Sequence, residues 1–327
     1  MAPVTREVYG GRGFRGVRNS LDSRGAKLDT LVWVRRGSAG TVPGDEREAD
    51  VTSAPRTEGR RRRLAANGIT LAVTEYAGDG PPLLLLHGIG SRAESWWPVL
   101  DGLAAHFQLF ALDFRGHGAS AKPERGYLFP DYAADLADVL DALAIDRPRI
   151  LGHSLGGLVA LEWAKTHPCQ AIAIALEDVA LRSEPGVLGA FDGWLALASM
   201  TRAEAAAAYR QEYPAWSDED CWRRAESITS TAPGVFVELR ADSATNLATG
   251  RDRVGDLSGI HSPLLLVHGD RATGSMLVPD DAARLTALVP NARLARVPTA
   301  GHTIHRDHPA AFLAAVIPFL TTAGEGD

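Results

Sequence analysis

From Leu64 onward, the hydrophobic residues of this chain repeat with two periods, one typical of strands and one typical of helices. Residues 69–76 alternate between apolar and polar side chains, which is typical of a strand with one exposed face. Residues 83–86 are four consecutive leucines, a run that suits a strand buried on both faces of a parallel sheet. Further strands are predicted at 109–114, 149–151, 171–176, 264–267 and 294–297.

Segments with apolar residues at helical spacing separate these strands. They cover 136–143, 155–165, 280–289 and 309–320. Strands that alternate with helices predict right-handed crossovers, and therefore an α/β fold with a mostly parallel sheet flanked by helices. In such a sheet, functional side chains gather beyond the carboxyl ends of the strands.

The alternation stops between residues 181 and 258. Thr201–Glu204 and Ser217–Asp220 have the spacing of capping boxes, so a helix is predicted to start at each. We therefore expect a helical lid at 181–258, inserted into a core of residues 63–180 and 259–322. The underside of a lid must be apolar, and the aromatic residues expected to line the substrate pocket are Trp194, Trp216 and Trp222.

Residues 1–62 differ in composition from the rest of the chain. They are rich in Arg, Gly, Ser and Pro, and the short apolar run Leu31–Val34 reads as an isolated strand. Such a segment buries too little apolar surface to offset the entropy of ordering, so a disordered basic extension is predicted. A basic docking arm or an organelle transit peptide are the alternatives.

The overall composition narrows the function classes. A formal charge of −6 gives no reason to expect nucleic acid as a partner. The chain has no run of about eighteen apolar residues, so no membrane span is expected. Two isolated cysteines, Cys169 and Cys221, form neither a disulfide framework nor a zinc site, which favours a reducing, cytoplasmic compartment. The composition carries no signal of the oligomeric state.

The segment Gly152–Gly156 has the spacing G-x-S-x-G between a predicted strand and a predicted helix. A turn this tight strains the nucleophile's backbone and requires small residues beside it. Ser154 would then present its hydroxyl at a helix N-terminus, where partial positive charge favours a developing anion. Ser154 is therefore the candidate nucleophile.

A serine hydroxyl needs a general base. His302 follows the last predicted strand, in a loop able to reach over the sheet edge, and is the candidate base. His305 and His308 follow at intervals of three residues. Acidic or cysteine ligands do not flank them at zinc-like spacing, so no metal is expected.

The negative oxygen formed during attack on a carbonyl needs preorganised donors. One candidate is the backbone N–H of Leu155, directly after the nucleophile. The second is the N–H of Ile89, in the loop that follows the four leucines.

Together these motifs resemble the α/β-hydrolase fold family, from about residue 64 to residue 320. The matching segments are His87–Gly88, Asp113–Ser120, Gly152–Gly157 and Gly301–His302. The resemblance implies an eight-stranded sheet, a lid after the sixth strand and no cofactor. A serine at position 154 argues against haloalkane dehalogenases and epoxide hydrolases, which carry aspartate there.

The acid that would complete the triad is where the chain departs from the family pattern. The family usually carries it after the seventh strand, where this chain has Ala272 in the usual position, two residues after Asp270. Some relatives carry the acid after the sixth strand, where Glu177 and Asp178 stand here. Asp178 is favoured, with Asp270 and Glu177 as alternatives.

The resemblance implies hydrolysis of a carboxylic ester or similar small, hydrophobic acyl compound through an acyl-enzyme. The same triad serves C–C bond hydrolysis, thioester cleavage and cofactor-free perhydrolysis within the family, and the fold does not choose among them. A hydrolase-like sensor that binds a ligand without turnover is the alternative outside enzymes.

Overall fold

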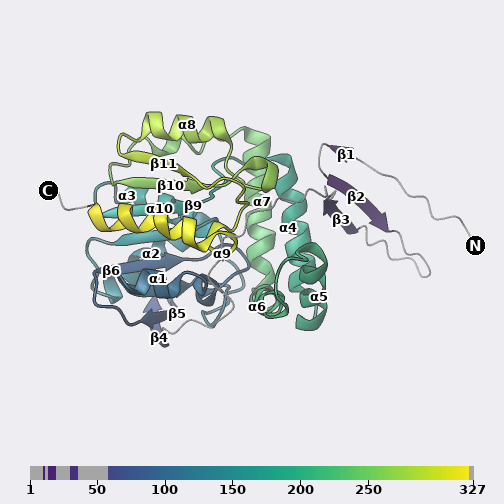
Figure 1. Cartoon of the computed structure of the whole chain (residues 1–327), viewed down its shortest axis with the longest axis horizontal. Coiled ribbons are helices and arrows are strands. Elements are labelled where there is room, and N and C mark those ends of the chain that lie inside the picture. Colours follow the sequence, from purple (N-terminus) through teal and green to yellow (C-terminus); the bar gives the residue numbers. More distant parts are fainter. Residues whose placement is uncertain (1–9, 12–13, 20–29, 36–57, 324–327) are drawn as a thin grey trace, which may run out of the picture.

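The eight strands of the central sheet lie between two layers of helices (Figure 1). The structure is a computed structural model that describes residues 10–11, 14–19, 30–35 and 58–323. In chain order the sheet contains β4 (Gly59–Ala66), β5 (Ile69–Tyr76), β6 (Pro82–Leu86), β7 (Gln108–Asp113), β8 (Arg149–His153), β9 (Ala173–Glu177), β10 (Leu264–His268) and β11 (Ala292–Arg296). The spatial order is β11-β10-β9-β8-β6-β7-β5-β4.

Six neighbouring strands, from β11 to β7, run parallel, and β4 and β5 join antiparallel at one edge. The leucines of β6 are buried because helices cover both faces. Leu84 and Leu86 pack on one side of the sheet, and Leu83 and Leu85 pack on the other. The predicted mostly parallel, eight-stranded α/β sheet is confirmed.

The helices of the core fall into two sets by the side of the sheet that they cover. On one side pack α2 (Phe129–Ala142), α3 (Leu155–Thr166) and α8 (Pro279–Leu288). On the other side pack α1 (Leu100–Ala104) and α10 (Pro309–Thr322), together with the short helices η1 (Ala93–Trp96) and α9 (Ile304–Asp307). Two further short helices are η2 (Gly255–Leu257) and η3 (Arg271–Thr273).

The insertion between β9 and β10 contains four α-helices at one end of the sheet (Figure 1). They are α4 (Pro185–Ala198), α5 (Arg202–Glu212), α6 (Asp218–Thr229) and α7 (Pro233–Thr249). Both predicted capping boxes are present: Thr201 accepts from the backbone N–H of Glu204 at 3.3 Å, and Ser217 accepts from that of Asp220 at 3.1 Å. β9 is the sixth strand of the sheet in chain order, so the insertion stands where the resemblance implies it.

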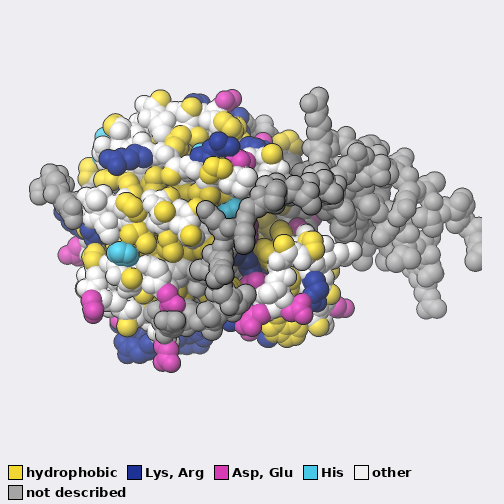
Figure 2. Space-filling view, viewed as in Figure 1, with side chains coloured by type: hydrophobic (Ala, Val, Ile, Leu, Met, Phe, Trp, Pro, Cys, Tyr) yellow, Lys and Arg dark blue, Asp and Glu magenta, His cyan; other side chains and the backbone are white. Residues whose placement is uncertain are grey.

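The arginine run belongs to the core sheet and not to the extension. β4 begins at Gly59 and pairs along its whole length with β5, so the predicted boundary at residue 62 falls inside a strand. β4 is an edge strand, and Arg60 pairs with Glu75 of β5 at 3.0 Å. Charged side chains discourage another strand from adding to an open edge. Dark blue side chains gather at this edge in Figure 2.

The predicted strand at 31–34 does not stand alone. It is β3 (Thr30–Arg35), and it pairs antiparallel with β2 (Phe14–Asn19), which pairs in turn with β1 (Gly10–Gly11). The expectation of an isolated strand was wrong because β2 has no apolar run in its sequence. The other residues before 58 lie outside the described residues, so their predicted disorder stays a prediction.

Within the described residues, none of the helices has the length and apolar character to cross a bilayer. Both cysteines carry free thiols; Cys169 is exposed and Cys221 is buried.

Candidate active site

Ser154 occupies a strained turn between β8 and α3. Its backbone has φ 51° and ψ −113°, a combination that non-glycine residues rarely adopt. The turn fits because Gly156 lies against β6: a Cβ on this glycine would stand 2.2 Å from the carbonyl oxygen of Leu86. The sharp bend places Ser154 directly before the N-terminus of α3, as the G-x-S-x-G spacing predicts.

Substitution of Gly156 by alanine should lower the free energy of unfolding by about 1–3 kcal/mol, because the new methyl group would collide with a backbone oxygen of a central strand. Urea denaturation measures the loss. Gly186→Ala is the matched control, since nothing lies within 4 Å of a Cβ there. Equal losses at the two glycines would contradict the steric explanation.

The ends of β8 and β9 lie side by side, which brings the residues after them together. His153 and Glu177 are partners in the register of the two strands, so Ser154 and Asp178 follow at the same edge of the sheet. The backbone N–H of Ser154 donates to the carbonyl of Glu177 at 2.9 Å. Asp178 also has a positive φ, of 44°, which turns the chain away from the sheet.

Asp178 is the acid that contacts His302. The Nδ1 atom of His302 lies 2.7 Å from Oδ2 of Asp178, which is completely buried. The carboxylate also accepts from the Ser275 hydroxyl at 2.5 Å and from the backbone N–H of Met276 at 2.8 Å. With Nδ1 donating its proton to the carboxylate, Nε2 of His302 is left as the basic nitrogen.

Burial opposes ionisation of Asp178, but the hydrogen bonds from His302, Ser275 and Met276 outweigh this effect. The pKa of Asp178 therefore lies below its ordinary value. The carboxylate is ionised at neutral pH.

The other two acids considered from the sequence have different partners. Asp270 pairs with Arg296 at 2.7 Å and accepts from the backbone N–H of Thr299 at 3.0 Å. Glu177 receives two hydrogen bonds from His305, from the backbone N–H at 2.8 Å and from Nδ1 at 2.7 Å. Of the three acids, the structure brings Asp178 to His302.

His153, Glu177 and His305 form a buried cluster directly behind the proposed triad. Their potential ligand atoms lie within 4.8 Å of one another, a grouping that the sequence reasoning missed because Glu177 is distant in the chain. His153 Nε2 donates to the carbonyl oxygen of His302 at 3.0 Å, and Glu177 holds His305. The cluster thus holds the backbone at His302 and at His305.

Three buried histidines next to the site, His87, His117 and His153, are neutral. Burial lowers the pKa values of His87 and His153 to about 3. His87 Nε2 accepts from the backbone N–H of Phe114 at 3.1 Å, so its Nδ1 donates to the carbonyl of Gly88. His117, whose pKa burial also lowers, accepts from the backbone N–H of Gly90 at 3.1 Å. These bonds fix the loop 87–90, which we term the oxyanion loop.

The stability of the fold should therefore fall as the pH drops from 6 to 5. In this window the unfolded chain protonates His87 and His153, whereas the folded chain does not, so protons favour unfolding. Each residue should cost on the order of 1.4 kcal/mol per pH unit. Urea denaturation at several pH values measures the slope, and His153→Gln should reduce it. An unchanged slope in that variant would contradict a neutral buried His153.

The oxyanion loop lies next to the nucleophile. A Cβ on Gly88 would stand 3.4 Å from Cβ of Ser154. Leu155 is the first residue of α3, so its N–H has no acceptor within the helix. Among residues 58–323, no hydrogen bond engages the N–H of Ile89. Neither N–H group thus has an acceptor among the described residues, and their role as oxyanion donors stays a prediction.

Ser154 and His302 do not share a hydrogen bond among the described residues. His153, which directly precedes Ser154 in the chain, lies next to His302. The centroids of the two imidazole rings are 4.7 Å apart. In enzymes without bound substrate, catalytic hydrogen bonds are often long or poorly aligned and tighten when substrate binds.

The three tryptophans expected in the pocket have different surroundings. Trp194 packs edge-to-face on Phe191 at 5.3 Å. Trp216 lies under the guanidinium of Arg306, 3.8 Å from the ring centroid, and Arg306 belongs to α9, just after His302. Trp222 is 45% exposed. Trp216 is thus the one that these contacts bring to the loop of His302, and pocket roles for all three stay predictions.

Several known proteins are similar to this chain in sequence and in structure. The sequence model for the alpha/beta hydrolase fold matches residues 81–309. The 2-(acetamidomethylene)succinate hydrolase of Mesorhizobium japonicum is 32% identical over 267 residues, which cover 79% of this chain and 94% of that protein. The N-formylmaleamate deformylase of Pseudomonas putida is 30% identical over 79% of this chain and 95% of that protein.

A solved structure of E-2-(acetamidomethylene)succinate hydrolase shares the fold, with a TM-score of 0.69 and 28% identity over 81% of this chain and all of that chain. One assignment follows from the strand order, from the helical insertion after the sixth strand and from these matches. The chain belongs to the α/β-hydrolase fold family.

Proposed function

We propose that this protein hydrolyses a small acyl compound, with Ser154 as nucleophile, His302 as general base and Asp178 as the orienting acid. The contact of 2.7 Å between His302 Nδ1 and the buried carboxylate of Asp178 carries this proposal. This contact holds His302 in the tautomer that leaves Nε2 basic, at the edge of the sheet where the strained turn holds Ser154.

The reaction begins when Oγ of Ser154 attacks the acyl carbon and Nε2 of His302 takes the hydroxyl proton. The N–H groups of Ile89 and Leu155 donate to the oxyanion that forms. His302 then gives its proton to the leaving group, which departs and leaves an acyl-serine. Water, deprotonated by His302, attacks this ester and releases the acid.

The bond that is cleaved is an acyl–oxygen or acyl–nitrogen bond. The family resemblance alone favours an ester. The names of the two relatives refer to an acetamido and an N-formyl compound, which adds acyl–nitrogen bonds to the candidates. The same steps serve both, because His302 protonates either leaving atom.

An enzyme is favoured over a ligand sensor. Ala272, which replaces the acid at the family's usual position, favours the sensor alternative. The contact of Asp178 with His302 from the end of β9 supports an enzyme whose acid follows the sixth strand.

Turnover of a probe panel tests the proposal. The panel contains 4-nitrophenyl acetate, an acetyl thioester, an N-acetyl enamide and a vinylogous diketone. We expect hydrolysis of the ester or the enamide by the natural chain, its loss in Ser154→Ala, and its retention in Ser258→Ala, an exposed serine before β10. Undiminished turnover in Ser154→Ala, or cleavage of the diketone alone, would contradict the proposal.

A further inference from the structure

Arg224 of α6 lies against the oxyanion loop. Its Nη1 donates to the carbonyl oxygen of Gly90, the residue after Ile89. Its positive charge also contributes, after burial, to the lowered pKa values of His87 and His117. The guanidinium is therefore close to the proposed oxyanion site.

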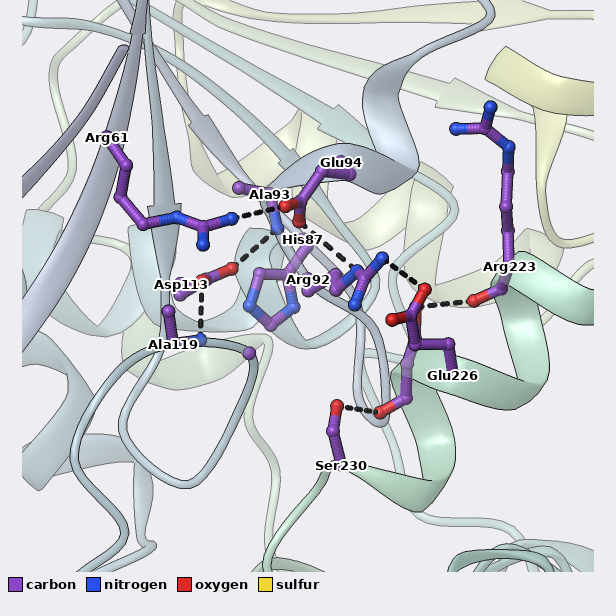
Figure 3. Close-up of polar contacts among 12 residues, drawn as sticks. Arg61, His87, Arg92, Ala93, Glu94, Asp113, Ala119, Arg223, Glu226 and Ser230 are labelled. Atoms are coloured by element: carbon purple, nitrogen blue, oxygen red, sulfur yellow. Dashed lines mark hydrogen bonds and ion pairs between the residues drawn. The ribbon is translucent and has the colours of Figure 1, made fainter. Parts of the chain in front are cut away.

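The charge of Arg224 has no acidic partner within ion-pair distance among residues 58–323. Two neighbouring arginines have acidic partners: Arg92 pairs with Glu226 at 2.8 Å, and Arg223 pairs with Glu219 at 2.5 Å. Figure 3 shows Arg92 and Glu226 facing each other, while the side chain of Arg223 extends away from them. The nearby cations are thus neutralised locally, and Arg224 is not.

The charge of Arg224 also acts on the pKa of Glu212. Burial raises the pKa of Glu212, and the charge of Arg224 opposes that rise only in part. Arg306 lies near Arg224: burial lowers the pKa of Arg306 and the charge of Arg224 lowers it further, whereas Asp220 and Asp307 raise it. Arg306 itself pairs with Asp220 at 2.7 Å.

A buried hydroxyl beside Arg224 also lacks a partner. The guanidinium carbon lies 5.4 Å from the ring centroid of Tyr209, which is 4% exposed. The hydroxyl of Tyr209 makes no hydrogen bond with the described residues. A buried polar group without a partner is costly, and a bound ligand with acceptor oxygens would remove this cost.

We infer that Arg224 binds a carboxylate of the substrate, so that the substrate is a small acyl compound carrying a free carboxylate besides the acyl group that is cleaved. One Nη of Arg224 donates to Gly90, and its other N–H groups can donate to a carboxylate. The inference rests on the proposed acyl hydrolysis at Ser154.

Two matched pairs of esters test this inference. In the first pair, mono-4-nitrophenyl succinate carries the carboxylate on the acyl part, and its methyl ester is the neutral counterpart. In the second pair, 4-acetoxybenzoate carries it on the leaving part, and methyl 4-acetoxybenzoate is neutral. We expect kcat/KM to favour the charged member of at least one pair by about tenfold to a hundredfold, the range of a charge-assisted hydrogen bond.

Arg224→Gln should abolish this preference, so that kcat/KM falls about tenfold to a hundredfold more for the charged member of a pair than for its neutral counterpart. Arg224→Lys, which keeps the charge without the planar fork, should keep part of it. Arg223→Gln is the matched control, because Arg223 pairs with Glu219 and not with the loop, and it should keep the full preference.

Equal losses for charged and neutral esters in Arg224→Gln would show that Arg224 only supports the loop, and would overturn the inference. Hydrolysis of both neutral esters by the natural chain without any charge preference would overturn it as well, while leaving the proposed function intact. Failure to hydrolyse any of the four esters and the N-acetyl enamide as well would count against the proposed function itself.

Discussion

Replacing Asp178 with asparagine should lower kcat by on the order of 10⁴-fold and change KM little. The amide NH₂ of asparagine would donate to Nδ1 of His302, which forces the proton onto Nε2. His302 then cannot accept the proton of Ser154. Steady-state kinetics with 4-nitrophenyl acetate measure the loss, and circular dichroism checks that the fold is retained.

Asp270→Asn is the matched control. Asp270 pairs with the exposed Arg296 and makes no contact with His302 among the described residues, so kcat should stay within about threefold. A large loss in Asp270→Asn with a small loss in Asp178→Asn would move the acid to the loop after β10.

Ser154→Ala and His302→Ala should each lower kcat by on the order of 10⁶-fold, and the double variant should be no slower than either single one. The two side chains act in one proton transfer, so removal of one already abolishes the contribution of the other. Single-turnover kinetics of the three variants measure the effect, with residual catalysis coming from the oxyanion donors and substrate binding.

Multiplicative losses in the double variant would show that the two residues act independently. Such a result would be incompatible with His302 serving as the base for Ser154.

Local signals in the sequence were sufficient for much of this architecture. The four leucines of β6 predicted a strand buried on both faces, and the capping boxes at Thr201 and Ser217 predicted the starts of α5 and α6. The glycines around Ser154 predicted the strained turn, because so tight a connection excludes larger side chains. Each of these features depends on residues close together in the chain.

Features that depend on distant residues were less predictable. The sequence left three acids as possible partners of His302. Asp178 reaches His302 because of the register of β8 and β9 and the position of the loop after β11. The pairing of Glu177 with His305 spans 128 positions, and no local pattern indicates it. The arginine run resembled the end of a tail, because only its partner strand β5 identifies it as a sheet edge.

Labelling with a fluorophosphonate probe, followed by peptide mass mapping, tests the central claim most directly. We predict rapid covalent modification of the natural chain at Ser154, and none in Ser154→Ala or His302→Ala. Modification at another residue, or no modification of a folded chain that still binds a ligand tightly, would contradict the proposed nucleophile.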